Sequence, residues 1–206
     1  MSRLRAAAFL CAPAALIAGA TGVAPPAGAE CVSSNGTTVC SQGTVRGAKA
    51  GLGRGLVAPD AVFPLMPLPT SPRTGSAEPA LVLALSRQES EFNARAVSGA
   101  DARGLMQMIP RYAQAEARMV GLPFRQSWLT DDPQYNLRLG RGFLDDLVDS
   151  FGGSYILAAA AYNAGPSRAR QWINDFGDPR SSGVDAVDWI ESIPFAETRN
   201  YVQRVL

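Results

Sequence analysis

Residues 85–90 read LSRQES and place a carboxylate where an amphipathic helix is expected to be apolar. Val82, Leu85, Glu89 and Phe92 follow the spacing of three and four residues that makes one face of a helix. Burial of a carboxyl group on such a face disfavours its charged form and raises its pKa toward the range of a general acid. Two interpretations of Glu89 stay open on this stretch alone: a desolvated proton donor, or an acid at the edge of the stripe that reaches solvent.

The composition is that of one well-buried domain with appendages, since 47% of the 206 residues are hydrophobic. The formal charge of +1 comes from 19 basic and 18 acidic residues, with no basic cluster that would indicate a nucleic-acid partner. Because the sequence has no histidine, Ser-His and Cys-His nucleophile pairs and histidine-ligated zinc are excluded. Proton transfer near neutral pH is therefore expected to depend on a carboxyl group, which favours the first interpretation of Glu89.

Residues 1–29 have the pattern of a secretory signal peptide. Arg3 and Arg5 precede an apolar stretch, and the small residues AGA at 27–29 form a cleavage site before Glu30. An uncleaved membrane anchor is the weaker alternative, because proline interrupts the stretch and large apolar residues are few. We therefore expect a periplasmic protein with no stable membrane insertion after signal cleavage.

Two cysteines flank a predicted hairpin. Cys31 and Cys40 lie on either side of Asn35-Gly36, a signal for a type I′ turn. Folding about this turn sets the cysteines opposite each other at a non-hydrogen-bonded pair, where a Cα separation of about 4.5 Å is compatible with a disulfide. We predict this bridge, which requires an oxidising compartment; two unpaired thiols in a flexible tail are the alternative.

Residues 30–75 are thus predicted to be the disulfide hairpin followed by a Pro/Gly-rich linker, which is either extended or laid along the domain surface. From residue 76 onward the pattern is helical, and no strand is required. A short helical turn is expected at 104–110, stopped by Pro110. The longer predicted helices are 80–92, 111–120, 133–151, 155–162, 166–176 and 195–206. The last of them has no C-terminal cap, from which we expect a shortened C-terminus.

Four short motifs follow one another in the helical part: ES at 89–90, GLMQ at 104–107 with proline at 110, AYNAG at 161–165, and IPFAETR at 193–199 with YV at 201–202. In order and spacing they resemble the catalytic domain of the soluble lytic transglycosylases, glycoside hydrolase family 23. The resemblance covers about residue 76 to the end and implies a mostly α, lysozyme-like helical domain with a cleft for peptidoglycan glycan strands. Ile109 departs from the family pattern, in which methionine is more common before the proline.

The resemblance also implies a chemistry that needs one acid and no metal or cofactor. By motif position, Glu89 protonates the glycosidic oxygen between N-acetylmuramic acid and N-acetylglucosamine, while the muramic 2-acetamido group stabilises the developing cation. Glu89 then acts as a base and helps the 6-hydroxyl of the same sugar close a 1,6-anhydro ring. This differs from most glycosidases, in which two carboxylates flank the scissile bond.

The motifs supply further candidates for substrate binding: Ser90, Gly104, Met106, Gln107, Tyr162, Asn163, Glu197 and Tyr201. Gly104 would let backbone approach the sugar, with Met106 and Gln107 on the cleft floor. Core filling is the alternative for Met106. Ser90 would tighten the helix or hydrogen-bond near the acid, and a plain surface serine is its alternative.

The remaining candidates lie on the last two motifs. Asn163 would hydrogen-bond a sugar amide or simply end its helix. Tyr162 is expected to form a wall of the cleft, and Tyr201 to orient Glu89 through its hydroxyl. Glu197 resembles the family's second acid, although a Glu and a Tyr four residues apart on a terminal helix usually form a solvated face.

Two rival functions remain open at the level of sequence. A peptidoglycan hydrolase on the same scaffold would need a second carboxylate to place a water, and Asp101 and Glu197 are the candidates. A non-catalytic wall-binding subunit of a secretion apparatus or another cell-envelope complex is the other rival.

Overall fold

The computed structural model describes residues 16–18, 30–34, 37–41, 45, 66–71 and 77–206. Contacts divide the chain into two compact units, Met1–Leu65 and Met66–Leu206. The predicted cleavage site at 27–29, the turn residues Asn35-Gly36 and most of the predicted linker lie outside the described residues.

The first unit contains an antiparallel sheet with the strand order β1-β3-β2. Strands β2 (Glu30–Ser34) and β3 (Thr37–Ser41) form the predicted hairpin, and their register pairs Cys31 with Cys40. That pairing of Cα positions confirms the expected register, while the disulfide stays a prediction. Strand β1 (Leu16–Ala18) pairs with β3 and falls inside the predicted signal segment, where no strand was expected.

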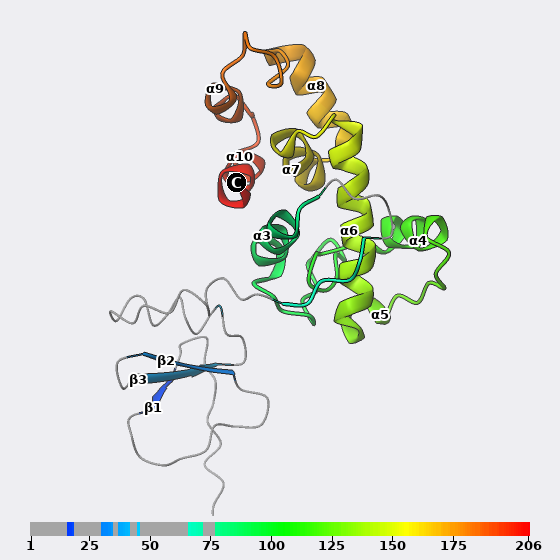
Figure 1. Cartoon of the computed structure of the whole chain (residues 1–206), viewed down its shortest axis with the longest axis vertical. Helices are drawn as coiled ribbons and strands as arrows, with labels where there is room; N and C mark the ends of the chain where they lie inside the picture. Colours follow the sequence, from blue (N-terminus) through cyan, green and yellow to red (C-terminus); the bar gives the residue numbers. More distant parts are fainter. Residues whose placement is uncertain (1–15, 19–29, 35–36, 42–44, 46–65, 72–76) are drawn as a thin grey trace, which may run out of the picture. The chain divides into compact units, whose positions relative to one another are not determined.

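The second unit is helical, as predicted (Figure 1). Its helices are α3 (Pro79–Ser90), α4 (Pro110–Met119), α5 (Trp128–Asp131), α6 (Pro133–Ser150), α7 (Tyr155–Ala164), α8 (Pro166–Phe176), α9 (Ala186–Glu191) and α10 (Ala196–Val205). Helix α6 contacts α4, α5 and α7, and α10 contacts both α3 and α7. Among the described residues no helix combines the length and apolar character needed to span a bilayer.

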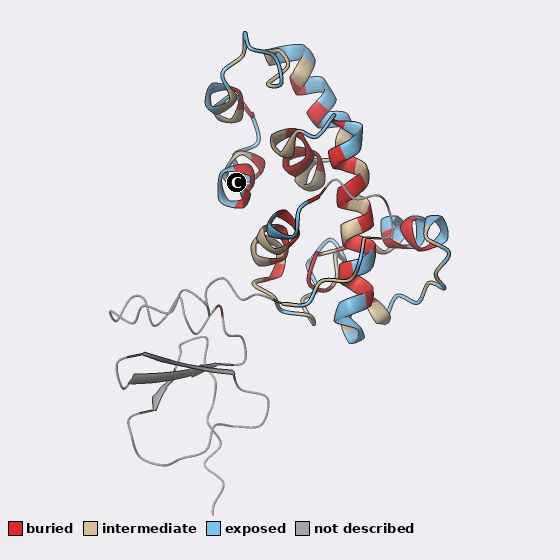
Figure 2. Cartoon of the chain, in the orientation of Figure 1, coloured by how far each residue is buried: buried red, intermediate tan, exposed pale blue. Residues whose placement is uncertain are grey.

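The predicted central helix lies in the core. Residues 157–161 of α7 are all buried, and four of these five are alanines. Such small side chains let α6, α8 and α10 approach α7, and they all contact it. Figure 2 shows the buried faces of α6, α7 and α10 turned toward one another.

Local sequence signals set several helix ends. The Asp132 carboxylate accepts a hydrogen bond from the Tyr135 amide at 3.0 Å, and the Ser154 hydroxyl accepts one from the Leu157 amide at 3.4 Å. Both side chains satisfy amide groups that would otherwise have no partner at a helix start. Gly165, at φ +95°, separates α7 from α8, which begins with proline as expected.

Other boundaries differ from the prediction. The segment 104–107 forms turns rather than a helical turn, and Pro110 opens α4 instead of stopping a helix, because proline suits the first helical position. Arg103 makes isolated antiparallel bridges with Val97 and Met108, the β-type pairing that the helical part was not expected to contain. Helix α3 ends at Ser90, two residues early, with Glu91 left-handed at φ 52°.

Two short helices, α5 and α9, lie between the predicted helices and were not expected. They contain four and six residues, which is too short for a helical period to stand out in the sequence.

The described part of the predicted linker lies along α6. The Arg141 guanidinium donates to the Pro69 carbonyl at 2.7 Å. The Asp145 carboxylate, fully buried, accepts hydrogen bonds from the Ser71 hydroxyl and, at 3.0 Å, from the Ala77 amide. The linker was predicted to be either extended or laid along the domain surface. Residues 66–71 lie along the surface and are bonded to the buried Asp145 carboxylate through Ser71.

Asp145→Ala is expected to lower the free energy of unfolding by about 1–3 kcal/mol, because it leaves the buried Ala77 amide without an acceptor. Asp145→Asn is the matched control, since its amide oxygen can still accept that hydrogen bond. Urea denaturation of both variants measures the difference. Equal transition midpoints would show that the tether contributes nothing.

Candidate functional site

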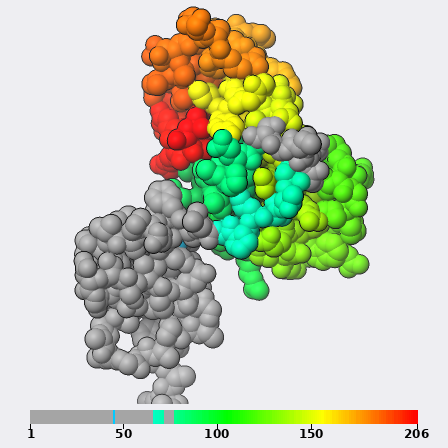
Figure 3. All heavy atoms as spheres, viewed as in Figure 1, coloured from blue at the N-terminus to red at the C-terminus, as the bar shows by residue number. Residues whose placement is uncertain are grey.

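A polar cavity of about 410 Å³ opens between the C-terminal end of α3, α10, the end of α7 and the loops before α4. It is lined by Gln88, Glu89, Ser98, Gln107, Asn163, Glu197, Asn200, Tyr201 and Arg204. In the space-filling view α10, in red, meets α7, in yellow, and α3, in green (Figure 3). Five of the nine predicted site residues therefore come together in one cavity: Glu89, Gln107, Asn163, Glu197 and Tyr201.

A hydrogen bond joins Glu89 to the last helix. The Tyr201 hydroxyl donates to Glu89 Oε1 at 2.7 Å. Tyr201 is only 4% exposed, so its ring is held by the core while its hydroxyl reaches the cavity. Glu89 is half-buried on the face that also carries Val82 and Leu85, both without exposed surface. Of the two interpretations of Glu89, the structure selects the desolvated acid.

Three effects set the protonation of this acid. The pKa of Glu89 is raised from 4.5 to about 7, and burial is the largest cause. The hydrogen bond from Tyr201 acts in the opposite direction and lowers the pKa. The nearby Glu197 charge has the smallest effect and raises it. A carboxyl group with this pKa can both donate and accept a proton at neutral pH.

The loop that carries the GLMQ motif is held by one buried side chain. Asn136 on α6 is fully buried; its Oδ1 accepts from the Met106 amide at 2.9 Å, and its Nδ2 donates to the carbonyls of Arg103 at 2.8 Å and Leu129 at 3.0 Å. A Cβ on Gly104 would lie 2.0 Å from the Leu129 carbonyl oxygen and 2.3 Å from Asn136 Nδ2. Gly104 is thus needed for close packing within the protein. The expectation that it also lets backbone approach a sugar stays a prediction.

Ser90 and Gln107 attach the same loop to its surroundings. The buried Ser90 hydroxyl donates to the Leu105 carbonyl at 2.8 Å, so the alternative of a plain surface serine is wrong. Ser90 does not line the cavity, and its assignment to substrate binding stays a prediction. Gln107 does line the cavity, with a left-handed φ of 45° and its Nε2 donating to the carbonyls of Ala96 and Gly104. A non-glycine residue in this conformation is costly, and such strain persists where the surroundings hold it in place.

Met106 is packed in the core, and Tyr162 is half-buried beside it. Met106 has no exposed surface, so the core-filling alternative is the correct one. The Tyr162 hydroxyl donates to the Met106 carbonyl at 2.7 Å, and Tyr162 does not line the cavity. Burial, with a smaller effect of the Glu89 charge, raises the pKa of Tyr162 well above its usual value, so this phenol stays protonated and can donate to the Met106 carbonyl of the loop. Its role as a wall of the cleft stays a prediction.

The Asn163 side chain is oriented by a threonine that the motif analysis did not single out. The buried Thr198 hydroxyl donates to Asn163 Oδ1 at 2.6 Å. This bond leaves Asn163 Nδ2 as a donor with no hydrogen-bond partner among the described residues. Asn163 therefore presents an amide N–H group to whatever occupies the cavity.

Four cavity residues were not predicted from the sequence: Gln88, Ser98, Asn200 and Arg204. A signal existed for two of them, because Asn200 and Arg204 lie three and seven residues after Glu197 and so share its helix face. Ser98 is placed by its loop, where its Oγ accepts from the amides of Ala100 and Ala102. In the described part of the chain no group of three or more Cys, Asp or Glu side chains is arranged to hold a metal ion.

A helical domain that holds a single carboxyl group of near-neutral pKa in a polar cleft defines a class of proteins equipped for general acid–base chemistry. Within that class, the chain belongs to the Transglycosylase SLT domain family, whose model matches residues 72–182, more than half of the 206 residues.

Known relatives agree with this assignment. The soluble lytic murein transglycosylase of Salmonella typhimurium is 41% identical over 126 residues, which cover 60% of this chain and 19% of the relative. The crystal structure of the 70 kDa soluble lytic transglycosylase of Escherichia coli superposes with a TM-score of 0.68 at 32% identity, covering 79% of this chain and 26% of that one.

A third relative is an inactive Glu-to-Gln mutant of the lytic transglycosylase Slt from Pseudomonas aeruginosa, with a TM-score of 0.65 and 34% identity over 78% of this chain and 26% of that one. The chain thus spans about a fifth to a quarter of the length of these relatives.

Glu89→Gln is expected to stabilise the fold at high pH. Because the folded-state pKa of about 7 exceeds the usual 4.5, the folded protein binds this proton more tightly than the unfolded chain, and stability falls as pH rises from 4.5 to 7. The variant lacks this loss and should gain up to about 3 kcal/mol over wild type between pH 5 and pH 8. Denaturant titrations at both pH values measure the gain, with Glu78→Gln, an exposed position, as the control. A gain independent of pH would contradict the raised pKa.

Proposed function

We propose that this chain is a peptidoglycan lytic transglycosylase that cleaves the bond between N-acetylmuramic acid and N-acetylglucosamine and leaves 1,6-anhydromuramic ends. The observation that carries the proposal is the half-buried Glu89, with a pKa of about 7, bonded to Tyr201 in a polar cleft. Membership in the Transglycosylase SLT domain family supports it.

In the first half of the reaction, protonated Glu89 gives its proton to the glycosidic oxygen, and the bond from that oxygen to C1 of the muramic residue breaks. The carbonyl oxygen of the 2-acetamido group on the same sugar stabilises the positive charge at C1, so no second protein carboxylate is required. The leaving sugar departs with the proton of Glu89.

In the second half, Glu89 is a carboxylate and accepts the proton of the 6-hydroxyl while that oxygen bonds to C1. The ring closes, Glu89 is protonated again, and no water is consumed. The Tyr201 hydrogen bond favours the carboxylate form of Glu89, and burial favours the neutral form. This balance suits a residue that must exchange one proton twice near neutral pH.

The polar cavity residues suit an amide-bearing sugar. Asn163 Nδ2 is available as a donor, and its oxygen is already bonded to Thr198. Gln107 uses its amide nitrogen on two backbone carbonyls, which leaves its oxygen as an acceptor toward the cavity. A donor and an acceptor in fixed positions match the carbonyl and N–H groups of an acetamido substituent.

The hydrolase rival is less well supported than the lytic reaction. Asp101 does not line the cavity and pairs with Arg103 at 2.6 Å. Glu197 lines the cavity, so it is the remaining candidate to place a water. The two reactions differ in their products, since an anhydro end is lighter than a reducing end by one water molecule.

Secretion and the hairpin disulfide belong to the same proposal. Cleavage before Glu30 would release the protein into the periplasm, where peptidoglycan lies, and the pairing of Cys31 with Cys40 in the β2–β3 register supports a bridge there. The non-catalytic rival, a wall-binding subunit of an envelope complex, would bind peptidoglycan without using the proton of Glu89.

Glu89→Gln tests the proposed function. The amide cannot supply a proton, so release of soluble fragments from purified peptidoglycan should fall by about 10³-fold or more, with wall binding retained. The Glu-to-Gln mutant of the Pseudomonas relative is described as inactive, in line with this expectation. Mass spectrometry of the wild-type products should find anhydro ends. Reducing ends would support the hydrolase, and unchanged lysis by Glu89→Gln would refute the assignment.

Changes beside Glu89 are expected to move the alkaline limb of the pH–activity profile in opposite directions. Tyr201→Phe removes a hydrogen bond that lowers the pKa of Glu89, so its limb should move to higher pH. Glu197→Gln removes a charge that raises the pKa, so its limb should move to lower pH. Initial rates of turbidity loss of a peptidoglycan suspension across pH 5–9 give the profiles.

Tyr112→Phe, which removes an exposed hydroxyl on α4 outside the cavity, is the control for this pair. Shifts of the same sign in Tyr201→Phe and Glu197→Gln would contradict Glu89 as the titrating group.

A further inference from the structure

Three residues that line the cavity have no part in the reaction proposed above. They are Gln88 on α3 and Asn200 and Arg204 on α10. Among the described residues these three side chains have no hydrogen-bond or ion-pair partner. Polar side chains that gather in a cleft and leave their groups unused by the protein are available for a ligand.

The cavity face of α10 carries charges of opposite sign at its two ends. Glu197 stands in the first turn and Arg204 in the last, seven residues apart and so about 10 Å along the helix axis. Tyr201, which bonds Glu89, lies between them. A ligand that occupies the whole cavity therefore meets an acidic end, the proton donor, and then a basic end.

Arg199, the other arginine on α10, has contacts within the protein that Arg204 lacks. Arg199 donates to the Ile193 carbonyl at 2.9 Å and lies 3.8 Å from the Glu191 carboxylate. Arg204 does neither. A cation in the last turn of a helix is stabilised by the helix dipole whichever way its side chain points. The dipole therefore accounts for a basic residue at this position, but it does not account for the position of Arg204 on the cavity face.

A guanidinium group with no protein acid beside it is suited to a carboxylate, which it can bind through two parallel N–H donors. The amides of Gln88 and Asn200, which line the same cavity, can donate to and accept from peptide groups. A carboxylate at the opposite end would be repelled by Glu197. The charges therefore favour one direction for an acidic ligand.

We infer that Arg204, with Gln88 and Asn200, forms a subsite for the carboxylate-bearing substituent of the muramic residue and so determines which glycan strands bind and in which direction. This rests on the proposed function, because the acidic substituent belongs to the proposed substrate. The carboxylate can come from the lactyl group of a peptide-free strand or from the stem peptide. In both cases Arg204 discriminates acidic strands from neutral ones.

The subsite is tested by measuring dissociation constants of ligands by isothermal titration calorimetry with the Glu89→Gln variant, which is expected not to cleave them. Three tetrasaccharides serve as ligands: a neutral N-acetylglucosamine tetramer, an alternating N-acetylglucosamine and N-acetylmuramic acid tetramer with free lactyl groups, and the same alternating tetramer bearing L-alanyl-D-glutamate. Adding Arg204→Gln should weaken binding of an acidic ligand about tenfold relative to the neutral one, the usual effect of losing a charged hydrogen bond. Arg204→Lys should lie between, because it keeps the charge but loses the paired donors.

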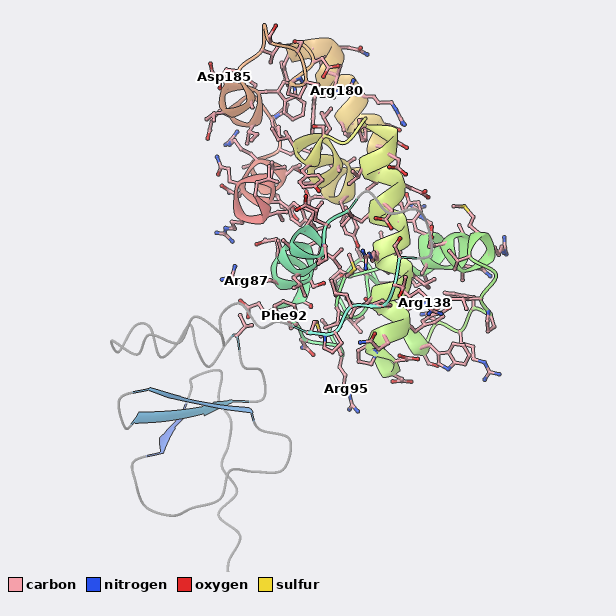
Figure 4. All side chains as sticks on the ribbon, in the orientation of Figure 1. Arg87, Phe92, Arg95, Arg138, Arg180 and Asp185 are labelled. Atoms are coloured by element: carbon pink, nitrogen blue, oxygen red, sulfur yellow. The ribbon has the colours of Figure 1, made fainter. Side chains whose placement is uncertain are left out.

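Arg138→Gln is the matched control. Arg138 is an exposed arginine on α6 that does not line the cavity (Figure 4), so its replacement changes the net charge equally. Circular dichroism of each variant confirms that the fold is retained, which the exposure of Arg204 favours.

Each outcome decides the matter. A selective loss with the free lactyl ligand assigns that carboxylate, and a loss only with the peptide-bearing ligand assigns the stem. Equal loss for acidic and neutral ligands, or no loss, overturns the inference. Anhydro products from the wild-type protein, measured separately, would leave the proposed function standing in that case.

Discussion

The hydrogen bond from Tyr201 to Glu89 joins the first helix of the second unit to the last, across 112 residues of the chain. It holds a carboxyl group in a half-buried place where desolvation would otherwise keep it neutral. Burial and the hydrogen bond act in opposite directions on the pKa of Glu89, and their balance lies near neutrality. In the proposed reaction one acid both gives and takes a proton, so that reaction would depend on α3 and α10 staying in contact.

The rest of the unit serves to keep the cavity walls in place. The GLMQ loop is held against α6 and α3 by hydrogen bonds of Asn136 and Ser90 and by close packing at Gly104. All of these contacts are made within the protein. Buried polar groups that are fully bonded rigidify a fold, whereas unbonded ones are costly. Polar groups without a partner among the described residues, such as those of Asn163 and Arg204, line the cavity.

A motif in this chain therefore mixes residues with different tasks. Within GLMQ, Gly104 and Met106 are packed in the core while Gln107 reaches the cavity. Within AYNAG, Tyr162 donates a hydrogen bond to the GLMQ loop and Asn163 reaches the cavity. Adjacent residues on a helix or turn point in different directions, so a motif indicates where a site lies without showing which of its members touch a ligand.

The sequence by itself determined the helical class, the caps and prolines that begin α6, α7 and α8, and the place of Glu89 on the apolar face of α3, because these depend on residues close together in the chain. It did not reveal α5, α9, Asn136, Thr198 or Arg204. Their positions and partners depend on contacts between segments far apart in sequence, and on helices too short to show a period. Only the tertiary structure decided which side chains face the cavity, since that choice is made by how the helices pack.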